Sequence, residues 1–205
     1  SSTAFDIYTR LVGKRDVLQA GTYRLSPASS TPEVVEHLVK GDVDEFSITF
    51  LPGATLAEHR QVFLDAGFTA TEVDTALKAT YDSPIFAGKP ATADLEGYIY
   101  GETYNFNSGA TVGDILKRTF TEFESVINEN GLVEGFASHG LNLYQGITLA
   151  SVVQREASSP TDRNQIAQVF YSRLASGMML GSDVTYQYIA DKLKVPRDTN
   201  LDSPY

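Results

Sequence analysis

The stretch FSITFLPGATLAE, residues 46–58, predicts a strand, a turn and the start of a helix. Apolar and polar residues alternate from Phe46 to Phe50, which is the period of a strand with one buried face. A Pro-Gly pair then marks a turn, and Thr55 stands three residues before Glu58, the spacing of a capping box at a helix start. We therefore expect a strand at residues 46–50, followed by a helix that ends near Gly67.

The next residues repeat the signal of a helix start. Thr69 and Glu72 have the same spacing, and we expect their helix to run to about Ala79. A strand, a glycine turn and two helices in this order resemble the LysM glycan-binding module, so residues 46–80 are expected to form a LysM-like element. A small α/β spacer without a ligand fits the same pattern equally well. Residues 81–92 contain two prolines and a glycine and are expected to be a linker.

The two flanking segments complete the expected architecture. In residues 1–45 we expect an extended stretch at 21–25 and a helix that begins at Thr31 and ends at Gly41. Residues 93–205 are expected to be mainly helical, with helices at about 111–130, 143–157 and 159–177. The predicted fold class is therefore α+β, with an N-terminal α/β portion followed by a mainly helical portion.

Composition and charge exclude several classes of function. The 205 residues include 16 Lys and Arg against 26 Asp and Glu, a net charge of −10, so no basic surface is expected that could neutralise the phosphates of a nucleic acid. The absence of cysteine excludes a disulfide framework and a cysteine-ligated zinc site. The three histidines, His37, His59 and His139, lie in separate segments, and no metal site is expected.

The hydropathy of the sequence predicts no membrane-spanning segment. Its apolar runs are far shorter than the roughly 20 residues that a spanning helix needs, so the chain as given is expected to be soluble. It begins at Ser1 without a start methionine, and we expect an anchor or signal segment upstream of it.

Glu156 stands out as a candidate acid. In a helix at residues 143–157, its side chain shares one face with Leu149, Val152 and Val153. A carboxyl group at the end of such an apolar stripe is expected to lose hydration, which raises its pKa because the charged form is disfavoured. A carboxyl group that holds a proton at neutral pH can donate it to a glycosidic oxygen. The alternative is a helix-end glutamate that pairs with a nearby arginine, Arg155, Arg163 or Arg173.

Two other stretches carry polar groups suited to a sugar. If residues 95–106 are extended, one face carries carboxylates and aromatic rings, namely Glu96, Tyr98, Tyr100, Glu102, Tyr104 and Phe106. Aromatic platforms beside carboxylates suit sugar rings, and the same tyrosines fit a core strand equally well. Three short polar residues follow the expected helix end at Gly177, where such side chains orient a ligand or cap the next helix; they are Ser182, Asp183 and Thr185.

Five segments, in their order along the chain, resemble the endolytic murein transglycosylase family, also called YceG-like. They are AGTY (20–23), LEGY with ETY (95–98 and 102–104), LASVVQRE (149–156), QVFYSRL (168–174) and GSDVT (181–185). The resemblance covers nearly the whole chain. It implies a lysozyme-like catalytic portion at residues 93–205, which is expected to be cut short after Tyr205.

The resemblance implies an enzyme that cuts peptidoglycan glycan strands internally. Glu156 is then the catalytic acid at the β-1,4 bond from N-acetylmuramic acid to N-acetylglucosamine, and the product carries a 1,6-anhydro muramic end. The resemblance implies no metal and no organic cofactor. The residues that it implies for positioning the sugars or orienting Glu156 are Glu96, Tyr104, Arg173, Ser182, Asp183 and Thr185.

The resemblance also implies a location and partners. Members of the family are anchored in the cell membrane by one N-terminal segment and act on the outer face of the cytoplasmic membrane. The expected partners are therefore peptidoglycan glycan strands and cell-wall synthesis enzymes, with no nucleic acid among them. The alternative is a non-catalytic glycan-binding or cell-wall scaffold protein whose catalytic groove has decayed.

Overall fold

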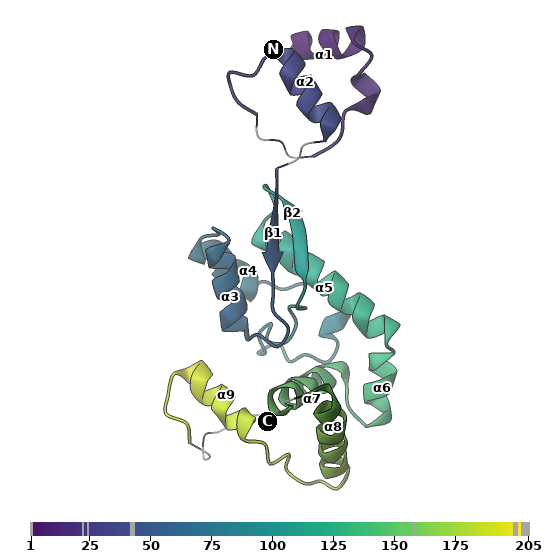
Figure 1. The fold of residues 1–205 in the computed structure, drawn as a ribbon. Helices are drawn as coiled ribbons and strands as arrows, with labels where there is room; N and C mark the ends of the chain where they lie inside the picture. Colours follow the sequence, from purple (N-terminus) through teal and green to yellow (C-terminus); the bar gives the residue numbers. More distant parts are fainter. Residues whose placement is uncertain are drawn as a thin grey trace.

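The computed structural model describes residues 2–21, 23, 25–41, 44–157, 159–198 and 201, which form a small sheet and many helices (Figure 1). The predicted α+β class is confirmed. In chain order the elements are α1 (Ser2–Leu11), the 3-10 helix η1 (Arg15–Val17), α2 (Thr31–Lys40), β1 (Glu45–Thr49), α3 (Leu56–Asp65), α4 (Ala70–Lys78), the 3-10 helix η2 (Pro84–Phe86), β2 (Thr103–Asn107), α5 (Val112–Glu129), α6 (Leu132–Ser138), α7 (Leu143–Glu156), α8 (Pro160–Ala175) and α9 (Asp183–Leu193). No helix in this described part of the chain has the length and apolar character that crossing a membrane requires.

The two N-terminal helices form a separate unit. α1 and α2 pack against each other, and Figure 1 shows them set apart from the remaining helices, beyond the start of β1. α2 begins after Ser30, which forms a capping box with Glu33, and Gly41 ends the helix in the left-handed conformation. The helix predicted from Thr31 to Gly41 is therefore confirmed.

Other predictions for this unit are less accurate. α1 is not among the helices predicted from the sequence. Of the extended stretch expected at residues 21–25, Thr22 and Arg24 lie outside the described residues, and the described positions 21, 23 and 25 belong to no strand.

The two strands of the sheet come from distant parts of the chain. β1 and β2 pair antiparallel, with Ile48 opposite Tyr104 and Thr49 opposite Thr103. α3 and α4 lie between them in sequence, which gives the order β1, α3, α4, β2. β1 confirms the strand predicted from the alternation at residues 46–50.

The segment before β2 contains a turn, although the sequence pattern of residues 95–106 also fits one extended strand. The Tyr98 N–H donates a hydrogen bond to the Leu95 carbonyl at 3.1 Å, and Gly97 between them has a φ of +79°. Glycine adopts this conformation without the steric cost that a Cβ atom would bring, and the chain bends there. The strand therefore covers residues 103–107 alone, and the expectation of one extended face over residues 95–106 is wrong.

Local capping interactions begin most of the helices. Reciprocal hydrogen bonds between the N-cap residue and the third helical residue begin α3, α4, α5 and α7, and the pairs are Thr55 and Glu58, Thr69 and Glu72, Thr111 and Asp114, and Asn142 and Gln145. At the start of α8 the Asp162 N–H donates to the Ser159 hydroxyl at 3.3 Å. Because each of these bonds lies within four residues, the sequence alone indicates where such helices start.

The main core is built from both sides of the predicted linker. Phe50, Phe63 and Ile115 are fully buried in it, together with other apolar residues of β1, α3, α4, β2 and α5. Ile85 and Phe86 of the linker stretch at 81–92 pack in the same core. The division into a unit at 46–80 and a unit at 93–205 stays a prediction.

A second cluster holds α7 against α8. Its buried members are Leu149, Val152, Val153 and Phe170. The three residues predicted to share one face of α7 therefore pack toward α8, and they bring Glu156, the last residue of α7, to the edge of this cluster. Figure 1 shows α7, α8 and α9 gathered at the end of the molecule opposite the N-terminal unit.

Replacing Phe63 by alanine is expected to lower the free energy of unfolding by about 3–5 kcal/mol, because a fully buried ring leaves a cavity in the main core. Leu51→Ala is the matched control. The Leu51 side chain is 66% exposed, and its truncation is expected to change stability by less than about 0.5 kcal/mol. Urea unfolding followed by circular dichroism measures both values, and a loss for Phe63→Ala no larger than the control's would contradict this core assignment.

Candidate functional site

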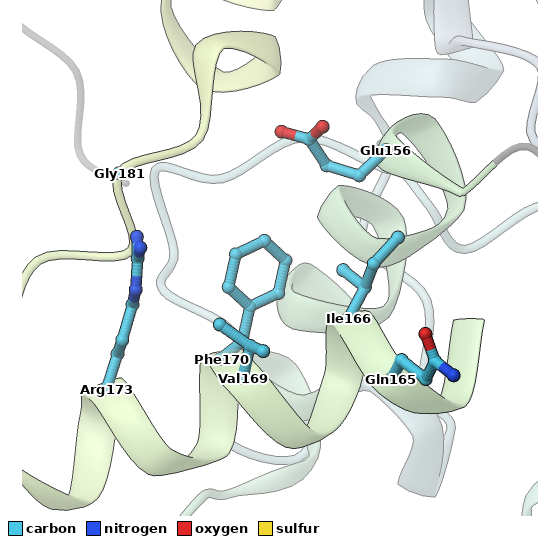
Figure 2. A pocket seen from close by; sticks show the side chains of 7 residues that line it. All are labelled: Glu156, Gln165, Ile166, Val169, Phe170, Arg173 and Gly181. Carbon is cyan, nitrogen blue, oxygen red and sulfur yellow. The ribbon is translucent and has the colours of Figure 1, made fainter. Parts of the chain in front are cut away.

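Glu156 faces a cavity of about 380 Å³ that is lined mainly by α8. Figure 2 shows its carboxylate extending from the end of α7 toward the segment that carries Gly181, with the ring of Phe170 below it in this view. The lining residues are Glu156, Gln165, Ile166, Val169, Phe170, Arg173 and Gly181. Among these described residues Glu156 is the one carboxylate. Nowhere in the described part of the chain do three or more histidine, aspartate or glutamate side chains gather in a way that could hold a metal ion.

A hydrogen bond joins Glu156 to the start of α9. The Ser182 hydroxyl donates to Oε1 of Glu156 at 2.5 Å, and Ser182 is buried. Ser182 is the N-cap residue of α9, yet its side chain caps no N–H of that helix. Within the described residues no ion pair joins Glu156 to Arg155, Arg163 or Arg173. The partner of the candidate acid is therefore a hydroxyl group and not a guanidinium group.

The other two polar residues at this helix start have different surroundings. The Thr185 hydroxyl donates to the Ser182 carbonyl at 2.8 Å, a hydrogen bond within the first turn of α9. Asp183 is the first residue of α9 and is exposed, and a negative charge at that position is favoured by the helix dipole. The structure thus brings Ser182 to Glu156 and places Asp183 and Thr185 beside Ser182 on α9.

Arg173 fixes the segment that leads into α9. Its Nη1 atom donates a hydrogen bond to the Leu180 carbonyl, and Figure 2 shows its side chain running from α8 toward Gly181. Gly181 has a φ of +63°, and a Cβ atom at this position would lie 2.5 Å from Nη1 of Arg173. Glycine therefore lets the guanidinium group pack against the backbone, and Arg173 forms one wall of the cavity that Glu156 faces.

Glu96 lies in a different and larger cavity. Its Oε1 atom accepts a hydrogen bond from the Leu56 N–H at the start of α3, at 2.9 Å, and its Oε2 atom accepts one from the Tyr188 hydroxyl of α9, at 2.8 Å. Burial raises the pKa of Glu96 above its ordinary value, although the two hydrogen bonds favour the charged form. One carboxylate thus links α3 to α9.

Residues near the C-terminal end of α7 also line this larger cavity. Its volume is about 740 Å³, and its polar lining includes Glu96, Ser151, Gln154, Arg155, Thr185 and Lys192. Gln154 and Arg155 directly precede Glu156 in α7, so neighbouring residues of one helix end line the two cavities.

Tyr104 lies in the main core and outside both cavities. It is 4% exposed, and its hydroxyl donates to the Tyr100 carbonyl at 3.0 Å. Burial raises the pKa of this phenol. Tyr98, from the same predicted face, is fully buried. Both tyrosines thus occupy core positions, and the structure does not bring Tyr104 to Glu156.

The sequence does not predict the contacts that hold α9 against residues 94–96. Lys192 Nζ donates to Oδ2 of Asp94 at 2.7 Å and to the Tyr188 hydroxyl at 3.0 Å, and Oδ1 of Asp94 accepts from the Glu96 N–H at 3.0 Å. Tyr188 and Lys192 are four residues apart in one helix, a spacing that predicts a shared face. Nothing in the sequence indicates that this face contacts residues 94–96.

Gly181→Ala is expected to destabilise the protein more than Gly177→Ala. Both glycines have a φ of +63°, so a side chain costs about 1–2 kcal/mol of backbone strain at either position. At Gly177 no atom lies within 4 Å of an added Cβ, whereas at Gly181 the Cβ displaces Arg173 and its hydrogen bond to Leu180, which adds about 1.5–3 kcal/mol. Equal losses in urea unfolding would contradict the contact between Arg173 and Gly181.

Glu96→Gln is expected to remove a pH-dependent part of the stability. Because burial raises the pKa of Glu96 in the folded state, the folded protein holds this proton more tightly than the unfolded chain does. The stabilisation is fully present below the ordinary glutamate pKa of about 4.3 and is lost as pH rises through the raised value. The free energy of unfolding of the wild type minus that of the variant, measured over a pH series, should therefore fall as pH rises. A difference that increases with pH would refute this sign.

Comparison with known proteins places the sequence in one family. The YceG-like family profile matches residues 1–205. An endolytic murein transglycosylase of Bacillus subtilis (strain 168) is 30% identical over 228 residues, and this chain spans 61% of its length. An endolytic murein transglycosylase of Streptococcus pneumoniae serotype 2 (strain D39) is 28% identical over 234 residues, in a match that covers 98% of this chain and 42% of that protein.

The fold is also similar to a solved structure. The crystal structure of a YceG-like protein from Listeria monocytogenes matches with a TM-score of 0.65 and 24% identity. The match covers 100% of this chain and 73% of that one, and it supports the similarity of fold. Because the family profile extends over every residue of the sequence, this chain belongs to the YceG-like family.

Proposed function

We propose that the protein carrying this chain is an endolytic murein transglycosylase that cuts peptidoglycan glycan strands internally. The observation that carries the proposal is the cavity in which one carboxylate, Glu156, lies over an apolar floor and accepts a hydrogen bond from Ser182. Relatives named endolytic murein transglycosylase match nearly all of the chain, which adds support.

A single carboxyl group suits the chemistry of this reaction. Hydrolysis by two carboxylates needs an acid together with a nucleophile or a base that activates water. In the proposed reaction Glu156 first donates its proton to the oxygen of the β-1,4 bond from N-acetylmuramic acid to N-acetylglucosamine, and the bond to C1 breaks. The resulting carboxylate then takes the proton from the C6 hydroxyl of the same muramic acid, whose oxygen bonds to C1. The product is a 1,6-anhydro end, Glu156 regains its proton, and no water is consumed.

The walls of the cavity suit a sugar. Sugar rings have apolar C–H faces, and Ile166, Val169 and Phe170 supply an apolar floor beneath Glu156. Arg173 lines the same space and Ser182 donates a hydrogen bond to Glu156, and we assign them to holding the sugar and orienting the acid. Asp183 and Thr185 lie beside Ser182 at the start of α9, and we assign them to contacts with the glycan there, Thr185 from the larger cavity that it lines. Tyr104 is left out of this set because its side chain is buried.

Further proposals concern the rest of the protein. The order β1, α3, α4, β2 with an antiparallel pair supports a LysM-like element, and the mainly helical part from α5 to α9 supports a lysozyme-like catalytic portion. A peptidoglycan substrate places the domain outside the cytoplasm. We assign attachment to the cell membrane to one N-terminal segment outside this chain, and we propose cell-wall synthesis enzymes as partners.

Glu156→Gln is expected to lower the rate of glycan cleavage by roughly 100-fold to 10,000-fold, because the amide cannot donate the acid's proton. Binding of glycan strands should persist, since the side chain keeps its shape. The measurement is incubation of the full-length protein with purified glycan strands, followed by mass spectrometry of the products. Glu134→Gln, at an exposed position of α6, is the control and should cleave like the wild type.

The outcomes separate the proposal from its alternatives. Products that carry an anhydro end support the transglycosylase step, whereas products heavier by one water would refute it. Cleavage that is unchanged in Glu156→Gln would assign the acid to another residue. A wild-type protein that binds glycan and never cleaves it would favour the non-catalytic scaffold.

A further inference from the structure

The loop at residues 94–96 holds α9 at two points, one in the middle of the helix and one near its C-terminal end. The Tyr188 hydroxyl donates to Oε2 of Glu96 at 2.8 Å, and Lys192 Nζ donates to Oδ2 of Asp94 at 2.7 Å. The ion pair of Lys192 and Asp94 is the weaker anchor, because its side chains are 43% and 39% exposed and water competes for both charges. The bond between Tyr188 and Glu96 is more shielded, since Glu96 is partly buried.

Glu96 is itself held in place by a second helix. Its other carboxylate oxygen accepts from the Leu56 N–H at 2.9 Å, in the first turn of α3. The first N–H groups of a helix have no partner within the helix, so this hydrogen bond satisfies an open donor and anchors Glu96 to α3. Glu96 therefore connects a helix of the main core to α9.

The N-terminal end of the same helix carries the contact with the candidate acid. Ser182 directly precedes α9 and donates to Oε1 of Glu156. Ser182 and Tyr188 are six residues apart, about 9 Å along a helix. If α9 moves as a rigid body, a displacement of Tyr188 therefore also displaces Ser182. A shift of α9 by less than 1 Å would lengthen the bond between Ser182 and Glu156 beyond its useful range.

We propose that Glu96 is a positioning residue for the acid: through Tyr188 it holds α9 where the Ser182 hydroxyl meets Glu156. The inference rests on the proposed function of Glu156. It changes the role of Glu96 from that of a sugar ligand to that of an anchor. Both carboxylate oxygens of Glu96 already accept hydrogen bonds from the protein, which agrees with an internal role.

Tyr188→Phe tests the bridge with the smallest change, because it removes one hydroxyl and keeps the ring. We expect kcat for glycan cleavage to fall on the order of 10-fold, with KM nearly unchanged, because the acid is misaligned and the sugar contacts remain. Tyr186→Phe is the matched control, the same substitution in the same helix at a residue outside both cavities, and it should behave like the wild type. A rise in KM with kcat unchanged would overturn the proposal, because it would mean that this pair contacts sugar.

The variants of Glu96 add a rescue test. Glu96→Ala should match the loss of kcat seen for Tyr188→Phe. Glu96→Gln should retain most of kcat, because its amide oxygen can accept from the Leu56 N–H while its amide nitrogen donates to the Tyr188 oxygen. A Glu96→Gln variant as impaired as Glu96→Ala would overturn a positioning role and require the charge itself.

A double-mutant cycle tests whether the bridge acts through Ser182. Ser182→Ala should lower kcat by itself, and adding Tyr188→Phe to it should cause little further loss, because the contact that the bridge serves is already gone. Losses that multiply would mean that Tyr188 acts by another route and would refute the proposed path.

Hydrogen exchange tests the bridge without relying on catalysis. Tyr188→Phe should speed amide exchange in residues 183–193 and leave α5 unchanged, whereas Tyr186→Phe should leave both helices unchanged. If Glu156→Gln still cleaves glycan, the proposed role of Glu156 fails while this result continues to support the anchor. If exchange in α9 does not respond to Tyr188→Phe, the anchor is refuted whatever the activity of the enzyme.

Discussion

The hydrogen bond from Ser182 to Glu156 joins the last residue of α7 to the start of α9, and the geometry of the candidate site depends on it. Each partner reaches the bond through a separate part of the fold. The buried apolar residues that pack α7 against α8 position Glu156. Ser182 is positioned by α9 and by the preceding segment, whose Leu180 carbonyl accepts a hydrogen bond from Arg173. The bond between Ser182 and Glu156 therefore depends both on apolar packing, which positions Glu156, and on polar contacts, which position Ser182.

Local interactions make much of the fold predictable from the sequence. A capping box such as that of Thr55 and Glu58 is complete within four residues, so its sequence signal carries the same information as the structure. The pairing of β1 with β2 joins residues more than 50 positions apart, and no local pattern encodes it. The bend at Gly97 is also hard to predict. The alternation of residues on both sides of this glycine fits one continuous strand, although the chain turns at the glycine.

The candidate site is predictable to the same extent. Glu156 follows from an apolar stripe at helical spacing, and that stripe is buried as expected. The sequence also points to Ser182 and Arg173 as candidates, but it does not predict their contacts, because these depend on how α8 and α9 fold back on α7. The resemblance implies that Tyr104, like Glu96, contacts the sugar, but the structure buries Tyr104 in the core. Whether an aromatic side chain of a strand is buried depends on which elements pack over the sheet, and the local sequence does not show this. Lys192 and Asp94 carry ordinary surface charges in the sequence, and their contact spans 98 positions.

Glu156 has apolar neighbours and one hydroxyl partner, Ser182, and the proposed reaction can use this hydroxyl at both of its stages. An acid that gives up a proton and then recovers it must be accommodated in its neutral and its charged form. A serine hydroxyl donates a hydrogen bond to a carboxylate, and after rotation about its C–O bond it accepts one from a carboxylic acid. An arginine in the same place would offer donors alone and would favour the charged form throughout. The Ser182 hydroxyl can therefore keep a hydrogen bond to Glu156 at both stages of the proposed reaction, in which a single carboxyl group acts as acid and then as base.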